Sequence, residues 1–345
     1  MSIDMNIFLL IAVGLVHPVG CVPAETSVLD IIAELIANRP SYSPYIPSAA
    51  YEADPKTEAE QIQFNRDQKY ERQIELILGD LHVQLMGTRD AQHFFNKVSV
   101  YGLPSYDNLR FYENFMLSYN QRLKQPNWAL EVLEDWHFKN KSTVRPSKAI
   151  RFYPDLQVHK YFRSTQYDYV AGSYDRGHFA PACDNKLKQT WLNIAYVSTN
   201  TAPQASNLNR DTCVWARLER YVSYLAFRSK NTYVITGALY KPLRDRRDLR
   251  YRVIGLNRIA VPTHFYKVIL YEDKNNNGNL SLEAFAVPNS RRVGPEEGLE
   301  QARIKVDDLD KLEGLSGLKF FDILDRSHIA KPLGYRYGFK EVIGK

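Results

Sequence analysis

The stretch Tyr174-Asp175-Arg176-Gly177-His178-Phe179-Ala180-Pro181-Ala182 decides how this chain of 345 residues is interpreted. Histidine is the natural general base near neutral pH. The glycine before it lets a backbone or a substrate approach closely. A histidine after a glycine is more often structural, however, so the role of His178 depends on the residues that follow it.

The segment after His178 supplies oxygen donors suited to a hard metal ion. These are Asn200, Asn207, Asn209, Asp211 and Glu219. Mg²⁺ takes such ligands and keeps several of its waters. Cleaving a phosphodiester needs an activated water, charge neutralisation on the phosphate and help for the departing alkoxide, and a base with a divalent cation meets these needs. An asparagine before a helix is also a common cap, so residue chemistry alone leaves both readings open.

The spacing of further motifs makes the pattern specific. Thr199-Asn200 and Pro203-Gln204 follow the histidine, Asn209 comes nine residues after Asn200, and Trp215-Ala216-Arg217-Leu218-Glu219 comes next. Together with the Asp-Arg-Gly-His run, these motifs resemble the DNA/RNA non-specific endonucleases of the ββα-metal fold, and among them the mitochondrial endonuclease G and exonuclease G-like group. Tyr101–Ser105, Tyr251–Gly255, Val261–Val268 and Ala286–Asn289 extend the resemblance to residues 98–325.

The resemblance implies a role for each matching residue. His178 would be the general base, and Asn209 would bind one Mg²⁺, for which Mn²⁺ could substitute. Glu219 would orient metal-bound water, Arg176 would hold phosphate or brace the site, and Asn200 would position the histidine loop. The resemblance also implies DNA and RNA as substrates, products with a 5′-phosphate and a homodimer, and it implies no lipid substrate.

Two departures from the family pattern leave alternatives open. Two extra residues separate Asn209 from Trp215, so counting back from the tryptophan places Asp211 at the ligand position. The family carries a phosphate-contacting arginine four residues after Glu219, where this chain has Ser223. The candidates to replace that arginine, or otherwise to contact nucleic acid, are Arg210, Arg217, Arg220 and Lys186. The alternatives are an inactive relative that binds nucleic acid or a protein partner, and an exonuclease-biased enzyme of the same fold.

The charge distribution favours a polyanionic partner. Residues 25–97 hold 12 acids and 7 bases, whereas residues 98–345 hold 38 bases and 26 acids, a net charge of +12. Lysine and arginine displace counterions from phosphates, so a basic body suits nucleic acid. An ordinary basic surface remains the alternative.

The residue pattern predicts an α+β fold, with a mixed or antiparallel sheet flanked by helices. Alternating or apolar runs predict strands at 114–119, 128–133, 195–198, 232–236 and 264–271, and the period becomes helical around 215–227. Residues 273–284 resemble an EF-hand loop but lack the glutamate at its twelfth position, so we expect a hairpin turn there. Cys183 and Cys213 are expected to be free thiols rather than a bridge.

The N-terminal part divides by composition. Residues 1–24 form an apolar targeting segment, 25–97 a helical acidic extension, and 98–345 the endonuclease domain. The apolar run 7–16 is too short to span a bilayer comfortably, and it precedes small residues suited to signal peptidase. This start suits secretion, whereas the resemblance suits mitochondria, in the intermembrane space or at the inner membrane, with residues 7–16 as import signal or membrane anchor. Both locations stay open.

Overall fold

The computed structural model describes residues 94, 96–138, 152–169, 174–208, 213–241, 249–274, 279–291, 298–304, 308–324, 326 and 329. The chain divides into two units, Met1–Gln92 and His93–Lys345, and every described residue belongs to the second. The expected targeting segment and nearly all of the acidic extension therefore lie outside the described residues. So do Asn209, Arg210 and Asp211.

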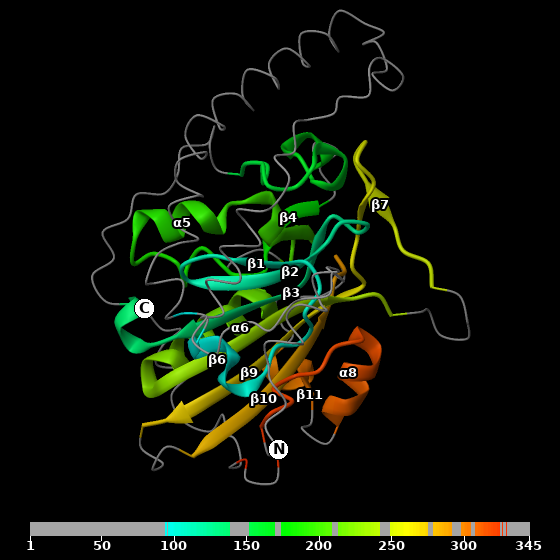
Figure 1. Cartoon of the computed structure of the whole chain (residues 1–345). Helices are drawn as coiled ribbons and strands as arrows, with labels where there is room; N and C mark the ends of the chain where they lie inside the picture. Colours follow the sequence, from blue (N-terminus) through cyan, green and yellow to red (C-terminus); the bar gives the residue numbers. More distant parts are fainter. Residues whose placement is uncertain are drawn as a thin grey trace, which may run out of the picture. The chain divides into compact units, whose positions relative to one another are not determined.

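A seven-stranded sheet forms the centre of the second unit. Its order is β1-β2-β3-β6-β9-β10-β11, and every neighbouring pair is antiparallel. Figure 1 shows the strands succeeding one another in this order from β1 to β10. The strands are β1 (Leu109–Phe111), β2 (Phe115–Asn120), β3 (Gln125–Leu133), β6 (Ser229–Leu239), β9 (His264–Asp273), β10 (Leu280–Pro288) and β11 (Arg303–Ile304). With its flanking helices, this sheet confirms the predicted α+β class.

Four of the five predicted strands are confirmed, as β2, β3, β6 and β9. The hairpin expected at 273–284 is confirmed by the pairing of β9 with β10, in which Glu272 faces Leu280. The strand predicted at 195–198 is wrong. Helix α5 (Gln189–Ala195) ends there, and the 3₁₀ turn η5 (Ser198–Asn200) follows. The amide groups of Tyr196 and Val197 bond back to Asn193 and Ile194, so local turn bonds replace a ladder.

The chain between β3 and β6 carries the motif residues. It contains the 3₁₀ turns η2 (Asp135–Phe138), η3 (Lys160–Phe162) and η4 (Gln166–Tyr169), then β4 (Tyr174–His178), α5, η5, β5 (Thr201–Ala205) and α6 (Val214–Arg228). Strands β4 and β5 pair with each other, apart from the central sheet. A third small sheet joins β7 (Val253–Ile254) to β8 (Ile259–Ala260).

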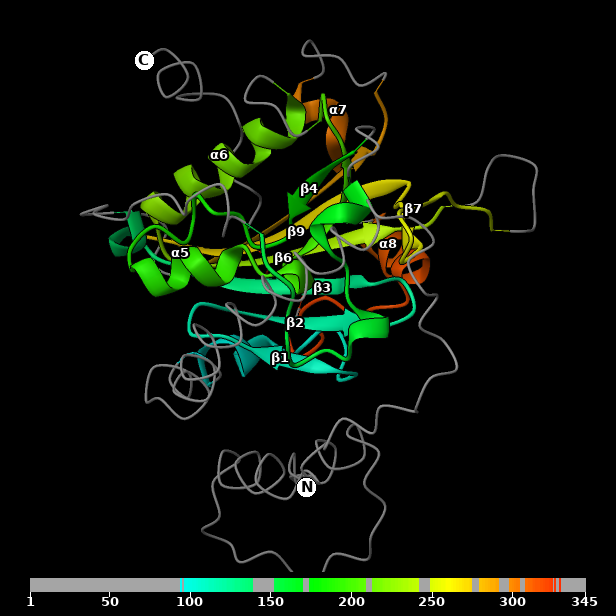
Figure 2. The same cartoon turned by 90° about the horizontal axis from the view of Figure 1, so that it is seen from above.

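Alternation along β9 sends neighbouring side chains to opposite faces of the sheet. Phe265 contacts Trp215 of α6, with ring centroids 5.6 Å apart. Tyr266 instead contacts Phe320, at 5.5 Å, in the segment after α8 (Leu309–Ser316). Helix α6 and the α8 segment therefore cover opposite faces, and both helices are visible beside the sheet in Figure 2. The described residues also include the turn η1 (Ser99–Tyr101) and the short helix α7 (Leu299–Ala302).

Helix α6 lies where the predicted helical period placed it. Its buried side chains recur every three or four residues, at Val214, Trp215, Leu218, Tyr221, Val222, Leu225 and Ala226. Such spacing packs one apolar stripe of the helix against the sheet. Burying one large apolar side chain completely stabilises the fold by about 2 kcal/mol. Residues 216, 217, 219, 220, 223 and 224 keep partial exposure on the other face. In the part of the chain that the structure describes, no helix is long and apolar enough to cross a membrane.

Candidate active site

Strands β4 and β5 hold His178 at the end of a short antiparallel ladder. His178 faces Thr201 across the pair, and Gly177 faces Ala202. A side chain at position 177 would not fit, because a Cβ built there lies 2.7 Å from the Cβ of Gln204. The glycine of the motif thus lets the two strands approach closely, as its position before the histidine suggested. His178 itself is partly exposed.

Two aromatic rings lie against the His178 imidazole. The ring centroid of Phe152 is 5.1 Å from it, and that of Tyr196 is 5.0 Å from it in an edge-on arrangement. Sequence reasoning missed both residues. Tyr196 fell inside the run wrongly predicted as a strand, and Phe152 lies far upstream in a segment that carried no recognised motif.

Asn200 fastens the loop that follows His178. Its side-chain amide donates to the carbonyls of Ala180 and Ala195, each at 2.9 Å, and its Oδ1 accepts from the Ala180 amide at 2.9 Å. The backbone of Phe179 also donates to the Asn200 carbonyl at 3.0 Å. Asn200 is fully buried. These bonds fix the loop after His178, and the positioning role that the resemblance implied for Asn200 stays a prediction.

Arg176 lies two residues before His178, on the same face of β4. Its guanidinium carbon is 4.7 Å from the Phe152 ring centroid and 5.3 Å from that of Tyr169. Its Nη1 donates to the Gln166 carbonyl at 3.3 Å. These contacts hold the guanidinium between two rings, which favours the bracing role over the phosphate-binding role.

Glu219 projects from α6 with partial exposure. Burial raises the pKa of its carboxyl to about 7; the nearby Asp184 adds to this rise, whereas Lys267 and a hydrogen bond from Trp215 oppose it. Burial likewise raises the pKa of Glu131 in β3, helped by Asp184 and opposed by Lys267. Lys267 is buried, with its Nζ 2.6 Å from Thr236 Oγ1 and 5.2 Å from the Trp215 ring centroid.

Ser223 lies one turn beyond Glu219, where the family pattern has an arginine. Its Oγ donates to Asp184 Oδ1 at 3.2 Å and to the Glu219 carbonyl at 3.2 Å. Asp184 is buried. The Asp184 carboxylate therefore accepts a hydrogen bond from the Ser223 hydroxyl of α6. Sequence reasoning noted Ser223 but missed its partner Asp184.

The remaining predicted residues are only partly placed. Arg217 is half-buried on α6, two residues before Glu219, and Lys186 is half-buried in the loop between β4 and α5. The metal-ligand candidates Asn209 and Asp211 lie outside the described residues. The residues flanking 209–212 are joined, since the Cys213 thiol donates to the Leu208 carbonyl. Cys183 and Cys213 are both free thiols, as expected.

Comparison with known proteins identifies the family. The profile of the DNA/RNA non-specific endonucleases matches residues 96–327. The chain belongs to this family. Its members depend on a divalent metal ion. In the described part of the chain, no group of three or more His, Cys, Asp and Glu side chains is arranged to hold a metal.

Similar proteins agree with this assignment. The chain is 35% identical over 239 residues to the mitochondrial nuclease EXOG of Xenopus laevis, covering 68% of this chain and 64% of the relative. It is 34% identical over 246 residues to the mitochondrial endonuclease G of Caenorhabditis elegans, covering 70% and 77%. A solved complex of EndoG with EndoGI, described as showing the mechanism of EndoG inhibition, matches with a TM-score of 0.63 and 33% identity. That match covers 69% of this chain and 95% of the solved one. Membership of the endonuclease family and these relatives support a hydrolase that acts on phosphodiester bonds.

Proposed function

We propose that this endonuclease-family chain is a metal-dependent, sequence-nonspecific endonuclease that hydrolyses phosphodiester bonds within DNA and RNA and leaves 5′-phosphates. The observation that carries the proposal is the fixed placement of His178 at the end of β4. Asn200 holds the loop that follows it, and α6 presents the Glu219 carboxylate. A positioned base contributes about 10²- to 10⁴-fold to such a reaction.

In this proposal His178 takes a proton from the attacking water. Asn200 sets the position of the base by holding Ala180 through both its amide and its carbonyl. The Arg176 guanidinium contacts the rings of Phe152 and Tyr169, and these contacts brace β4. Glu219 accepts a hydrogen bond from water in the site when its carboxyl is ionised, and orients that water.

A divalent cation, Mg²⁺ with Mn²⁺ as a substitute, would neutralise charge on the phosphate and assist the leaving oxygen. Asn209 is the proposed ligand, and Asp211 is the alternative that the two extra residues raise. Both supply the oxygen that a hard cation prefers. Substituting each in turn, Asn209→Ala and Asp211→Ala, and measuring Mn²⁺ binding by isothermal titration identifies the ligand. The residue whose substitution abolishes Mn²⁺ binding is the metal ligand.

Nucleic acid would be held by basic side chains near the site, with Lys186, Arg210 and Arg217 as the proposed phosphate contacts. Contacts to phosphate position a duplex without reading its sequence, which suits a nonspecific nuclease. The second candidate function, an inactive member that binds nucleic acid or a protein partner, rests on one observation. Ser223 is bound to Asp184 at the place of the family's arginine.

The test is cleavage of closed circular plasmid and of a structured RNA by residues 25–345, with Mg²⁺ and with EDTA. We expect metal-dependent nicking that His178→Ala abolishes. The matched control is His264→Ala. His264 is the first residue of β9 and bonds the preceding Thr263, so its loss should leave cleavage intact. A folded wild type without cleavage in Mg²⁺ or Mn²⁺ supports the inactive binding protein. Activity on linear but not on circular DNA supports an exonuclease.

The names of the relatives also support a location, and the family resemblance is the basis for a proposed homodimer. We propose a mitochondrial protein, because the relatives named above are mitochondrial nucleases. A fluorescent reporter fused behind residues 1–24 distinguishes mitochondrial import from secretion. The proposed homodimer predicts a particle of twice the monomer mass in light scattering.

A further inference from the structure

Phe152, Tyr196 and His178 form a cluster of three rings, each in contact with the other two. The centroid distances are 5.1 Å for Phe152 and His178, 5.0 Å for His178 and Tyr196, and 5.0 Å for Phe152 and Tyr196. Rings at such distances are in favourable contact, each pair being worth about 1 kcal/mol beyond its buried area. The imidazole therefore packs against two aromatic rings that also contact each other.

The backbone around Phe152 is fastened to the segment that carries Tyr196. Tyr153 forms an isolated parallel bridge with Val197. The Tyr153 amide donates to the Tyr196 carbonyl at 3.2 Å, and the Ser198 amide donates to the Tyr153 carbonyl at 2.7 Å. Phe152 therefore precedes a residue whose backbone is fastened to the 196–198 segment at both its amide and its carbonyl.

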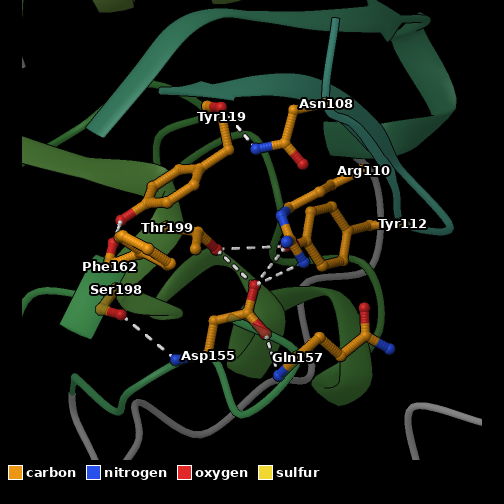
Figure 3. A network of polar contacts seen from close by, with 9 residues as sticks. All are labelled: Asn108, Arg110, Tyr112, Tyr119, Asp155, Gln157, Phe162, Ser198 and Thr199. Carbon is orange, nitrogen blue, oxygen red and sulfur yellow. Dashed lines mark hydrogen bonds and ion pairs between the residues drawn. The ribbon is translucent and has the colours of Figure 1, made fainter. Parts of the chain in front are cut away.

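Asp155 anchors the same segment from within the protein (Figure 3). Its Oδ2 accepts from Arg110 Nη1 at 3.3 Å and from Thr199 Oγ1 at 3.0 Å, and its Oδ1 accepts from the Gln157 amide at 2.9 Å. Its own amide donates to Ser198 Oγ at 3.2 Å. Asp155 is buried, with 1% exposure. A buried carboxylate with this many donors fixes its neighbours, because leaving it without partners costs several kcal/mol.

The contacts of Asp155 link the segment that carries Phe152 to the segment that carries Asn200. Thr199 precedes Asn200, which holds the loop after His178. Phe152, three residues before Asp155, contacts both the His178 ring and the Arg176 guanidinium. Phe152 is partly exposed rather than part of the core. The Phe152 ring therefore buries less apolar surface than the ring of a core phenylalanine does. It nevertheless contacts two side chains of the proposed site.

We propose that Phe152 is a positioning residue that sets the orientation of the His178 imidazole, and that Asp155 is the buried anchor that holds Phe152 in place. This inference rests on the proposed nuclease function. Removing the Phe152 ring takes away one of the two rings in contact with the His178 imidazole, so the imidazole shifts relative to the attacking water. A misplacement of about 1 Å at a reacting group costs about 100-fold in rate.

The first experiment compares Phe152→Leu with Phe152→Tyr in full kinetic measurements on plasmid DNA with Mg²⁺. Leucine keeps an apolar side chain and removes the ring, so we expect kcat to fall about 10- to 100-fold with KM within about threefold. Tyrosine restores the ring and should restore kcat. The matched control is Phe227→Leu, an exposed phenylalanine near the end of α6, which should leave kcat unchanged. Asp155→Asn, measured alongside, should give an intermediate fall.

The second experiment measures the contact without measuring activity. The ring protons of His178, identified by the signals lost in His178→Ala, should show an upfield ring-current shift in the NMR spectrum. Phe152→Leu should reduce that shift, and Phe227→Leu should not. Thermal melting of each variant checks that it is folded.

The outcomes separate the two hypotheses. If the wild type cleaves DNA, and Phe152→Leu lowers kcat while Phe152→Tyr restores it, the proposal stands. If the wild type cleaves but folded Phe152→Leu keeps kcat within about twofold, the positioning role is wrong and the nuclease function stands. If the folded wild type does not cleave at all, the proposed function fails, and the positioning role fails with it.

Discussion

Asn200 acts on His178 through the backbone of the residues that follow the histidine. The asparagine makes three side-chain hydrogen bonds, two of them to Ala180, and all of them are buried. A buried group that loses its partner costs about 1–3 kcal/mol. The position of the base is thus tied to the stability of a small, fully satisfied network.

The substitution Asn200→Ala should expose this link. Three partners lose their bonds, so we expect the free energy of unfolding to fall by about 3 kcal/mol and kcat to fall about 100-fold. Urea denaturation and plasmid cleavage measure the two effects. Asn193→Ala, on α5, is the matched control, because the Asn193 side chain bonds only the exposed Gln189 among the described contacts. Unchanged cleavage by folded Asn200→Ala would show that the clamp does not matter for the base.

Glu219 should make stability depend on pH in an unusual direction. Burial raises its pKa from 4.5 to about 7, so between these values the folded protein binds a proton that the unfolded chain has released. The contribution of this group to stability is therefore present below pH 4.5 and is lost as the pH rises through about 7. Glutamine at this position removes the charge. The melting temperature of Glu219→Gln minus that of the wild type, measured in EDTA, should increase from about pH 5 to about pH 8.

Cleavage should depend on the same group in the opposite sense. The proposal needs the ionised carboxylate, so wild-type activity should rise across neutral pH. Glu219→Gln should be slower and should lose part of that rise.

If the difference in melting temperature between Glu219→Gln and the wild type stays constant across the pH range, the raised pKa of Glu219 is contradicted.

The sequence predicted a role for some residues of the site and not for others. His178, Asn200 and Glu219 stand in motifs that resemble the family's, and their predicted roles come from that resemblance. Phe152 and Asp155 could not be assigned in this way, because their roles arise from contacts with residues distant in the chain, His178 for Phe152 and Thr199 for Asp155. A signal for Lys267 was present. It lies between Phe265 and Ile269 on one face of an apolar strand, so a buried lysine could have been expected.

Among the elements, the β4–β5 pair depends on the absence of a side chain at Gly177. A Cβ there would lie 2.6 Å from Gln204 Oε1 and 2.7 Å from Gln204 Cβ. Both contacts are too close for real atoms, so the strands would have to separate. Because His178 is the next residue, the separation would also move the base.

Gly177→Ala should therefore lower both stability and activity. We expect a loss of about 1–3 kcal/mol in the free energy of unfolding, the usual cost of overpacking, and a fall in kcat of about 100-fold. Gln204→Gly removes the clashing atoms, so the double variant should be more stable than Gly177→Ala alone. A double-mutant cycle with no coupling would contradict the close approach of the two strands.

Elements with strong local patterns were predicted and others were not. The alternation in β2, β3, β6 and β9 and the helical spacing of α6 are local, and all were predicted. Residues 195–198 carry an apolar run that is typical of a strand, but α5 ends at Ala195 and turn bonds continue to Asn200. An apolar run of four residues does not distinguish a buried strand from a buried helix end. The strand order could not be predicted either, because β3 pairs with β6 across almost a hundred intervening residues.

In the second unit, the central sheet is built from segments before and after the motif region. Strands β4 and β5 and helix α6 all come from the segment between β3 and β6. The sequence of residues 98–345 adds a net charge of +12 to this arrangement. A strongly basic body attracts any polyanion, so its effect on nucleic acid should depend on salt and not on base sequence.

Salt should therefore weaken substrate binding before it affects the chemistry. Each phosphate neutralised by a lysine or arginine releases counterions, so affinity falls steeply with salt. Between about 50 and about 200 mM NaCl, with Mg²⁺ held constant, we expect KM for duplex DNA to rise about tenfold or more, while kcat changes little. Lys186→Gln and Arg217→Gln, each measured over the same range, should flatten the salt dependence if these side chains contact phosphate. Substrates of different base composition should give the same slope. A KM that is insensitive to salt would mean that the basic charge does not face the substrate, and the binding contacts would then have to be sought elsewhere on the molecule.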